Sequence, residues 1–266
     1  MYTIHSYQAE ARAVHLAVGL GQGILTKTMP AIKRSRANVA WGGKPLPSRG
    51  PKPTLSTDQI ARSAIRLADA EGLAAVTMQR VAREVGVTTM ALYRYFSGKA
   101  DLLALMIDSA SDSPLRFGKP SLPWSTRLKE WAGRCLAIYR NHPWFLEATS
   151  ARPTVMGPNE LSWMEAALAM LAESGLGPRA RHHAFLAIIG HVRGHATFQQ
   201  IGTGTRVGKE WARELTQLLQ SEPNRYPILL DVIRSGAFSQ NIDNAFEFGL
   251  DCILDGIRAR ATRPSR

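Results

Sequence analysis

Hydrophobic and polar residues follow a helical period along most of the chain beyond residue 55. Apolar residues recur at spacings of three and four, as at Leu128, Trp131 and Cys135, and no stretch shows the strict alternation typical of a strand. The pattern predicts short helices after Pro143 and over residues 225–234, and longer helices over residues 125–140, 161–174, 179–201, 209–220 and 242–260. The chain is therefore predicted to be all-α.

The stretch from Ala75 to Leu103 predicts two short helices around a glycine turn, followed by the start of a third helix. Thr77 and Thr88 are suited to cap the first two helices, and Gly86 between them can supply the positive φ that a tight turn needs. Two helices that cross around such a turn form a helix-turn-helix, whose second helix lies in the major groove of DNA. The sequence therefore predicts a DNA-reading helix over residues 88–96.

The composition of this second helix suits contact with DNA. Thr88 and Thr89 near its start carry short hydroxyls that can approach base edges, and Arg94 can bind a guanine or a phosphate. Tyr93, Tyr95 and Lys99 are suited to the phosphate backbone, which fixes register without specifying sequence. The alternative is an amphipathic helix that only packs inside a helical protein.

Residues from Leu55 to about Ala110 closely resemble the DNA-binding domain of the TetR family of bacterial one-component repressors. The resemblance rests on LADAEGL, TMQRVAREVGV and LYRYFSGKADLL, in which a tyrosine stands where the family commonly has a histidine. It implies a three-helix head that binds a double-stranded DNA operator. By position, it assigns base contacts to Thr88, Thr89, Met90 and Arg94, and phosphate contacts to Thr77, Tyr93, Tyr95 and Lys99.

The charge of the chain agrees with a polyanionic partner, because the formal net charge is +12 and the isoelectric point is near 10.2. No acidic residue occurs from Ala11 to Thr57, and residues 41–53 are rich in glycine and proline. Residues 1–54 are therefore predicted to form a basic, flexible arm. The arm either contacts phosphates and the minor groove or is a solvated tail, and Met29 is an alternative start of the native protein.

The remaining organisation follows from proline and glycine positions. We expect the helix-turn-helix domain at residues 55–110, a linker at 111–124, and a helical effector-binding and dimerisation domain at 125–262. No segment is long and apolar enough to span a membrane, and residues 13–25 are too polar for a signal peptide, so a soluble cytoplasmic protein is expected. Cys135 and Cys252 lie in apolar helical patterns and are predicted to be buried free thiols.

The downstream part resembles the TetR-type regulatory domain more loosely, through segments such as GPNELSWMEAAL and FEFGLDCILDGI. The resemblance implies a cavity for a small-molecule effector and a homodimer. Small residues along 184–196 and 245–257 would let two helices pack closely against their symmetry mates, and twofold symmetry matches a palindromic operator. The alternative is that these helices are central in one monomer.

Side chains with large flat or pliable faces are the candidates to line such a cavity. Each is also a candidate core residue. We predict effector contacts for Trp131, Tyr139, Trp163, Met164, Phe185 and Phe198, with Met170 as a further candidate. The polar groups that could orient a flat, hydrophobic effector are Arg134, foremost, and His182, His183, His191 and Arg193.

A histidine pair raises a second interpretation. His191 and His195 stand four residues apart on one predicted helix, which is metal-ligand spacing, so a metal-sensing regulator or a metal-dependent hydrolase is the alternative. The glutamate of a metalloprotease helix is missing, and Arg193 between them would repel a cation. The sequence therefore favours a ligand-responsive regulator, most simply a repressor, with no catalytic residue, metal or cofactor.

Overall fold

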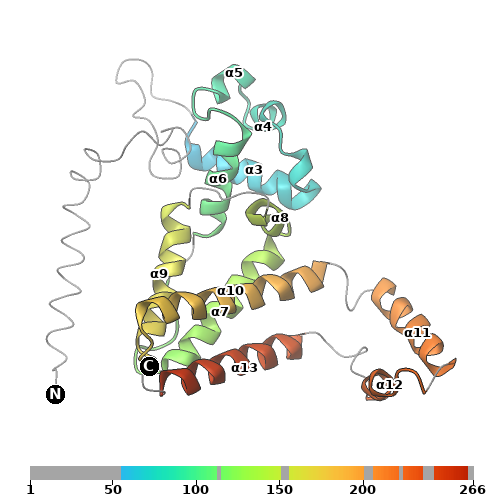
Figure 1. The fold of residues 1–266 in the computed structure, drawn as a ribbon. Coiled ribbons are helices and arrows are strands. Elements are labelled where there is room, and N and C mark those ends of the chain that lie inside the picture. The colour runs from blue at the N-terminus through green and yellow to red at the C-terminus, as the bar shows by residue number, and fades with distance from the viewer. Residues whose placement is uncertain are drawn as a thin grey trace, which may run out of the picture.

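The structure is a computed structural model, and it describes residues 55–112, 115–150, 156–200, 206–221, 224–235 and 243–262 (Figure 1). The basic arm predicted over residues 1–54 lies outside these ranges. Every regular element within them is helical, so the prediction of an all-α protein is confirmed. None of the helices in this part of the chain has both the length and the apolar character needed to cross a membrane.

The N-terminal head consists of α3 (Thr57–Glu71), the 3₁₀ turn η1 (Leu73–Ala75), α4 (Met78–Glu84), α5 (Thr89–Leu92) and the first part of α6 (Lys99–Ala110). Helix α3 begins in a capping box, because Ser56 Oγ accepts from the backbone N–H of Gln59 at 3.1 Å and Gln59 Oε1 accepts from that of Ser56 at 2.8 Å. Side chains of α3, α4, α5 and α6 then close one hydrophobic core, which includes the buried Ile60, Val81, Leu92 and Phe96.

Helix α6 belongs to both halves of the molecule. It packs against α3 in the head and against α8 and α9 below it, and Figure 1 shows it running from one part into the other. Met106 and Ile107 on this helix are fully buried within the same cluster that contains the core of the body. The head is therefore continuous with the body through α6, so a shift of this helix would be felt on both sides.

The body consists of α7 (Trp124–Asn141), α8 (Trp144–Ser150), α9 (Pro158–Ala172), α10 (Pro178–Gln200) and α13 (Asp243–Ala261). Proline stands at the first position of α9, and Gly175 with a φ of 87° follows its end, as the sequence predicted. Helix α10 lies at the centre and packs against α7, α9 and α13. Leu128, Leu171, Ile188 and Leu254 form part of the fully buried core between these helices.

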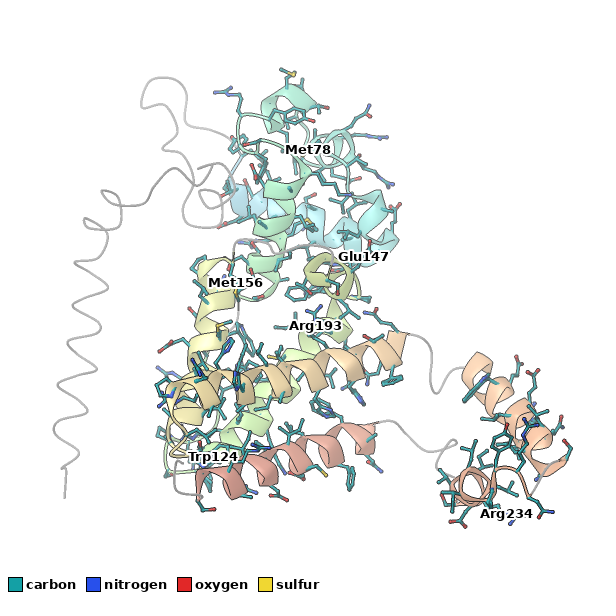
Figure 2. The ribbon with its side chains drawn as sticks, viewed as in Figure 1. Met78, Trp124, Glu147, Met156, Arg193 and Arg234 are labelled. Carbon is teal, nitrogen blue, oxygen red and sulfur yellow. The ribbon has the colours of Figure 1, made fainter. Side chains whose placement is uncertain are left out.

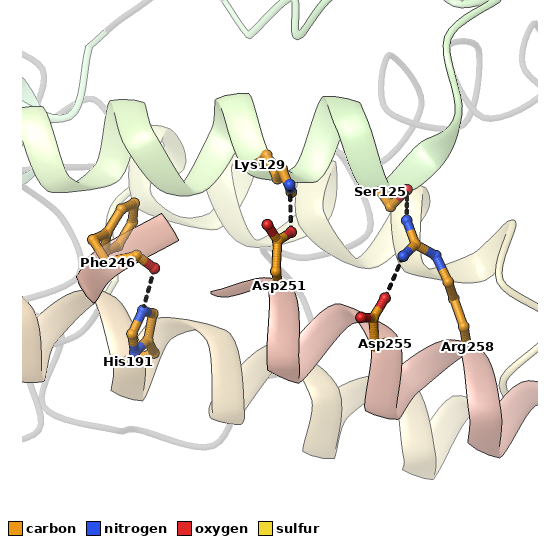
Figure 3. Close-up of polar contacts among 7 residues, drawn as sticks. All are labelled: Ser125, Lys129, His191, Phe246, Asp251, Asp255 and Arg258. Carbon is orange, nitrogen blue, oxygen red and sulfur yellow. Dashed lines mark hydrogen bonds and ion pairs between the residues drawn. The ribbon is translucent and has the colours of Figure 1, made fainter. Parts of the chain in front are cut away.

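Polar contacts attach α13 to its neighbours (Figure 3). Arg258 donates to Ser125 Oγ at 2.6 Å and to Asp255 Oδ1 at 2.6 Å, and Lys129 forms an ion pair with Asp251. At the other end of α13, His191 Nε2 lies 2.9 Å from the backbone oxygen of Phe246. Gly249 permits this approach, because an added Cβ would overlap the imidazole of His191.

Two further helices, α11 (Arg206–Ser221) and α12 (Pro227–Arg234), pack against each other and lie to the side of the body in Figure 1. They carry several exposed apolar side chains, among them Trp211, Leu218 and Ile228. This pair therefore adds little to the core around α10.

Two sequence expectations are wrong in detail. The DNA-reading helix was expected to reach Phe96, but α5 ends at Leu92, because Arg94 and Tyr95 donate to the carbonyls three residues earlier, at 3.2 and 3.0 Å, and tighten the backbone into turns. Cys252 was expected to be buried but is exposed. It lies on α13 away from the buried line of Phe246, Leu250 and Leu254.

Candidate nucleic-acid interface and effector cavity

The helix-turn-helix of the head has the caps and the turn that the sequence predicted. Thr77 Oγ1 accepts from the backbone N–H of Arg80 at 3.2 Å, and Thr88 Oγ1 accepts from that of Ala91 at 3.2 Å. Gly86 between them has a φ of 71°, which disfavours residues with a Cβ. The geometry therefore holds α5 at a fixed angle to α4.

Helix α5 lies at the tip of the head (Figure 1). Thr88 and Arg94 are exposed, Thr89 is half-buried, Met90 is 75% exposed and Tyr93 is 46% exposed. Leu92 alone of the four helical residues is buried. A short helix that is anchored by one buried leucine and carries exposed or half-buried side chains elsewhere has the form needed to enter a groove of DNA.

Besides Thr77, two further predicted phosphate contacts have partners within the head. The hydroxyl of Tyr95 donates to the backbone oxygen of Leu55 at 3.1 Å, and Nζ of Lys99 donates to that of Leu73 at 3.2 Å. Lys99 remains exposed at the start of α6, whereas Tyr95 is half-buried. Both bonds fix the side chains beside α5, and their DNA contacts stay predictions.

One stabilising contact of the head was not predicted. Arg80 on α4 donates through both Nη atoms to the carboxylate of Glu71, at 2.7 and 2.5 Å, and so ties α4 to the end of α3. The two residues are nine positions apart on different helices, so no periodic pattern marks the pair. It orients α4 on the support that α3 provides.

The body contains a cavity of about 350 Å³, open to solvent on one side, between α7, α8, α9 and α10. Its wall contains five of the residues predicted to contact an effector, namely Trp131, Tyr139, Trp163, Met164 and Phe185. Further lining residues were not predicted: Ser111, Cys135, Ile138, Phe145, Thr149, Met156, Glu160 and Ile189. The spacing of four between Phe185, Ile189 and Arg193 on α10 marks the face that points inward.

The indole rings of the cavity have their polar atoms satisfied elsewhere. Trp131 Nε1 donates to the backbone oxygen of Trp163 at 2.9 Å, and Trp163 Nε1 donates to that of Ser111 at 2.7 Å. The ring centroid of Trp131 lies 6.1 Å from that of Trp163 and 6.0 Å from that of Phe185. The rings therefore offer the cavity their apolar carbon surface, which suits a flat hydrophobic molecule.

Two predicted effector contacts lie outside the cavity wall. Arg134 is stacked over Phe117, 4.8 Å from the ring centroid, and donates to the backbone oxygen of Arg116 at 3.0 Å. Phe198 is 58% exposed near the end of α10. Met170 is buried in the core instead, and His182 and His183 are exposed at the start of α10.

Arg193 contributes a cation to the cavity wall, on the side of α10 that faces α8 (Figure 2). It donates to the hydroxyl of Tyr139 at 3.2 Å, to Thr149 Oγ1 at 2.8 Å and to Ser150 Oγ at 2.7 Å. Burial raises the pKa of Tyr139, and the nearby guanidinium opposes part of this rise. The thiol of Cys135 also has a pKa raised by burial, so it is an inert part of the wall.

The predicted histidine pair has no metal-site geometry in the described part of the chain. His191 is bonded to Phe246 O, and His195 lies 3.3 Å from the amide nitrogen of Gln199. The two ring centroids are 6.5 Å apart. No group of three or more potential metal-ligating side chains occurs among the described residues. The positions of the two rings thus give the metal-dependent interpretations no support.

The cavity is joined to the head through the end of α6. Ser111, which follows α6, lines the cavity and accepts the indole N–H of Trp163 through its backbone oxygen. A second connection joins α3 to α8, because Asp69 Oδ1 accepts from Trp144 Nε1 at 2.7 Å and lies 2.8 Å from His142 Nδ1. A side chain of the cavity wall, Trp163, is thus hydrogen-bonded to the residue that follows α6.

Comparisons with known proteins agree with this geometry. Residues 56–106 match the family of bacterial regulatory proteins described as the tetR family, and residues 118–261 match the tetracyclin repressor-like C-terminal domain. The HTH-type transcriptional repressor DrrR1 of Streptomyces coeruleorubidus is 36% identical over 250 residues, which cover 90% of this chain and 91% of that protein.

Among solved structures, ActR from Streptomyces coelicolor is similar in two ligand complexes. The complex with actinorhodin has a TM-score of 0.72 at 25% identity, and that with (S)-DNPA has a TM-score of 0.67 at 26% identity. Each alignment covers 80% of this chain and 100% of that one. Since the matches extend over both the head and the body, the chain belongs to the TetR family of DNA-binding transcriptional regulators, which are not enzymes.

Proposed function

We propose that this regulator is a homodimeric repressor that binds a palindromic operator and is released by a flat, hydrophobic small molecule held in the cavity of the body. The observation that carries the proposal is the aromatic cavity, whose wall is bonded to the end of α6 through Trp163 and Ser111. The similarity to the repressor DrrR1 and to ActR, which is known in complex with actinorhodin and (S)-DNPA, supports the same function.

The DNA-binding step rests on the exposed side chains of α5. Thr88, Thr89 and Met90 would face base edges, and Tyr93 and Arg94 would flank them in the major groove. Two heads related by a twofold axis would then enter successive major grooves about 34 Å apart, which is one helical turn of DNA. A palindromic site matches this arrangement because each half-site contacts the same residues.

The dimer contact is proposed for the face formed by α10 and α13. A groove on this face is lined by small side chains, including Ala180, Ala187 and Gly256, together with the exposed Cys252. Small residues let helices of a second copy approach closely. An isologous contact here, with its twofold axis along the direction from body to head, would place the two heads on the same side of the dimer.

Release requires that the effector prefers one head spacing over another. An effector that binds the DNA-incompetent form more tightly weakens operator binding by the ratio of its two affinities, about 5- to 150-fold for typical allosteric coupling. The displaced element would be α6, since its end contributes Ser111 to the cavity wall.

A mobility-shift titration with the DNA that flanks the gene of this protein tests the proposal. We expect a specific complex that weakens steeply with salt and dissociates when planar aromatic compounds are added. Filling the cavity by Ile189→Phe should leave the complex intact and abolish the release, whereas Leu186→Phe on the exposed face of the same helix should change neither. Equal release of both variants would refute the assignment of the cavity, and no preference over random DNA would refute the repressor.

A further inference from the structure

The cavity contains a positive charge, on Arg193, that no carboxylate of the described residues neutralises. The three acceptors of the Arg193 guanidinium are all neutral hydroxyls, on Tyr139, Thr149 and Ser150. No carboxylate within the described ranges forms an ion pair with it. A charged group that is half-buried beside aromatic rings is poorly solvated, so an anion that enters the cavity would replace solvent favourably.

The Arg193 guanidinium also has N–H groups that no described residue accepts from. It carries five N–H groups in a planar fork. Nη1 uses two of them on Tyr139 and Thr149, and Nη2 uses one on Ser150. The Nε–H and the second Nη2–H thus have no acceptor among the residues that the structure describes. Two remaining donors of one guanidinium fit the two oxygens of a carboxylate.

The position of Arg193 is held before any ligand binds. Thr149 Oγ1 donates to the backbone oxygen of Phe145 at 2.8 Å, and Ser150 Oγ donates to that of Leu146 at 2.6 Å. Since both hydroxyl groups donate their protons to backbone oxygens of α8, their oxygen lone pairs can accept hydrogen bonds from Arg193. The hydroxyls therefore fix the fork, and less side-chain entropy is lost on binding.

Glu160, the carboxyl group that the described residues contribute to the cavity wall, does not serve as the counter-charge of Arg193. Glu160 Oε2 accepts from the backbone N–H of Gly157 at 3.2 Å, as part of the cap of α9. Burial raises the pKa of this carboxyl, which favours its neutral form. Glu160 and Arg193 thus lie on different walls, with the rings of Trp131, Trp163 and Phe185 completing the cavity.

We infer that the effector is a planar aromatic carboxylic acid whose carboxylate is bound by Arg193 while its rings lie against the aromatic wall. The inference rests on the proposed function, because it concerns the same cavity, and it adds the chemical class of the ligand. A carboxylic acid and the neutral amide of the same ring system have nearly the same shape. A difference between their affinities therefore measures the contribution of the carboxylate charge, and the contact of the rings with the aromatic wall is the same for both.

The test uses anthracene-2-carboxylate and anthracene-2-carboxamide on the full-length protein. Binding is followed by quenching of tryptophan fluorescence, since Trp131 and Trp163 line the cavity. We expect the acid to bind about 10- to 100-fold more tightly than the amide, as one charge-assisted contact supplies. Arg193→Gln should remove this preference, and Arg193→Lys should retain part of it. Arg181→Gln, on the same helix but outside the cavity, should leave it unchanged.

The outcomes separate this inference from the proposed function. Equal affinity for acid and amide, or an Arg193→Gln variant that keeps the preference, would overturn the inference while leaving the cavity as an effector site. If neither compound binds and release by all aromatic compounds fails, the proposed function fails and the inference with it. Circular dichroism melting of Arg193→Gln and Arg193→Lys shows whether each variant is folded, and the lysine variant keeps the charge test valid if the glutamine variant is unstable.

Discussion

The carboxylate of Asp108 on α6 accepts the backbone N–H of Asn159 in the first turn of α9 at 2.8 Å. Asn159 returns the contact, because its side-chain Nδ2 donates to the backbone oxygen of Asp108 at 3.1 Å. Asp108 thereby supplies the cap that Gly157, which has no side chain, cannot give to α9. Through this pair, the helix that carries the head is bonded to a helix that carries Trp163 and Met164 of the cavity.

Substitution of Gly157 should disturb this junction. A Cβ at residue 157 would overlap the Asp108 carboxylate and lie 2.6 Å from Asp108 Cβ, so Gly157→Ala must push α6 and α9 apart. We expect a loss of about 1–3 kcal/mol in the free energy of unfolding, the usual cost of overpacking. Urea unfolding measures it. Gly133→Ala is the control, because a Cβ there has open space, and a similar loss in both variants would contradict the role of the junction.

The ionisation of Glu160 should make the free energy of unfolding depend on pH. Burial raises the pKa of this carboxyl above its ordinary value of 4.5, so the folded state binds the proton more tightly than the unfolded chain does. Its contribution to stability is therefore fully present below pH 4.5 and is lost as the pH rises through the folded-state pKa. Glu160→Gln removes this titration.

Urea midpoints for the wild type and Glu160→Gln, measured from pH 4.5 upward, should diverge in favour of the variant. Glu165→Gln on the exposed face of α9 serves as the control, since it should follow the wild type at every pH. Parallel curves for the wild type and Glu160→Gln would contradict the raised pKa.

The residues of α5 and its C-cap Tyr93 should divide into two classes by their effect on DNA binding. The exposed hydroxyl of Tyr93 suits a phosphate, so Tyr93→Phe should weaken specific and random DNA by a similar factor, several-fold at most for one neutral hydrogen bond. Thr89→Ala should change the preferred base at one position of each half-site instead. Mobility shifts on a library of single-base operator variants distinguish the two, and unchanged binding by both variants would overturn the assignment of α5.

The thiols should report on the dimer face. Cys135 is buried, with a raised pKa, and should not react with a disulfide reagent in the native protein. Cys252 is exposed in the single chain, in the groove between α10 and α13, so a second copy seated there should protect it. We expect slow labelling of the wild type and fast labelling of one thiol per chain in Ala187→Arg. Fast labelling of Cys252 in the wild-type dimer would place the interface elsewhere.

The sequence predicts the local features of this protein better than the assembled ones. The caps of Thr77 and Thr88 and the turn at Gly86 depend on residues within one or two turns, so their pattern is sufficient. Whether a side chain lines the cavity depends on the rotation of its helix and on what packs opposite. Arg134 lies outside the cavity wall because its guanidinium stacks over the rings of Phe117 and Trp163. Phe198 is exposed because it lies near the end of α10.

Glu160 and Thr149 line the cavity although the sequence pattern does not identify them as lining residues. Neither has a residue type that marks an apolar ligand site, and both line the cavity because α8 and α9 each form part of its wall. The shortened α5 has a similar cause, since Phe96 must turn into the core of the head where α6 begins. Such positions are set by contacts between segments far apart in the sequence.

The bond from Tyr95 to Leu55 has a practical consequence for handling the protein. It pins the point at which the first 54 residues join the head, next to the turn that follows α5. An affinity tag or fluorophore fused directly before Leu55 would lie beside the surface that we propose to face DNA, where it would compete with the operator. Labels for binding assays are therefore better attached to the body, for instance on the outward face of α9 at Glu165.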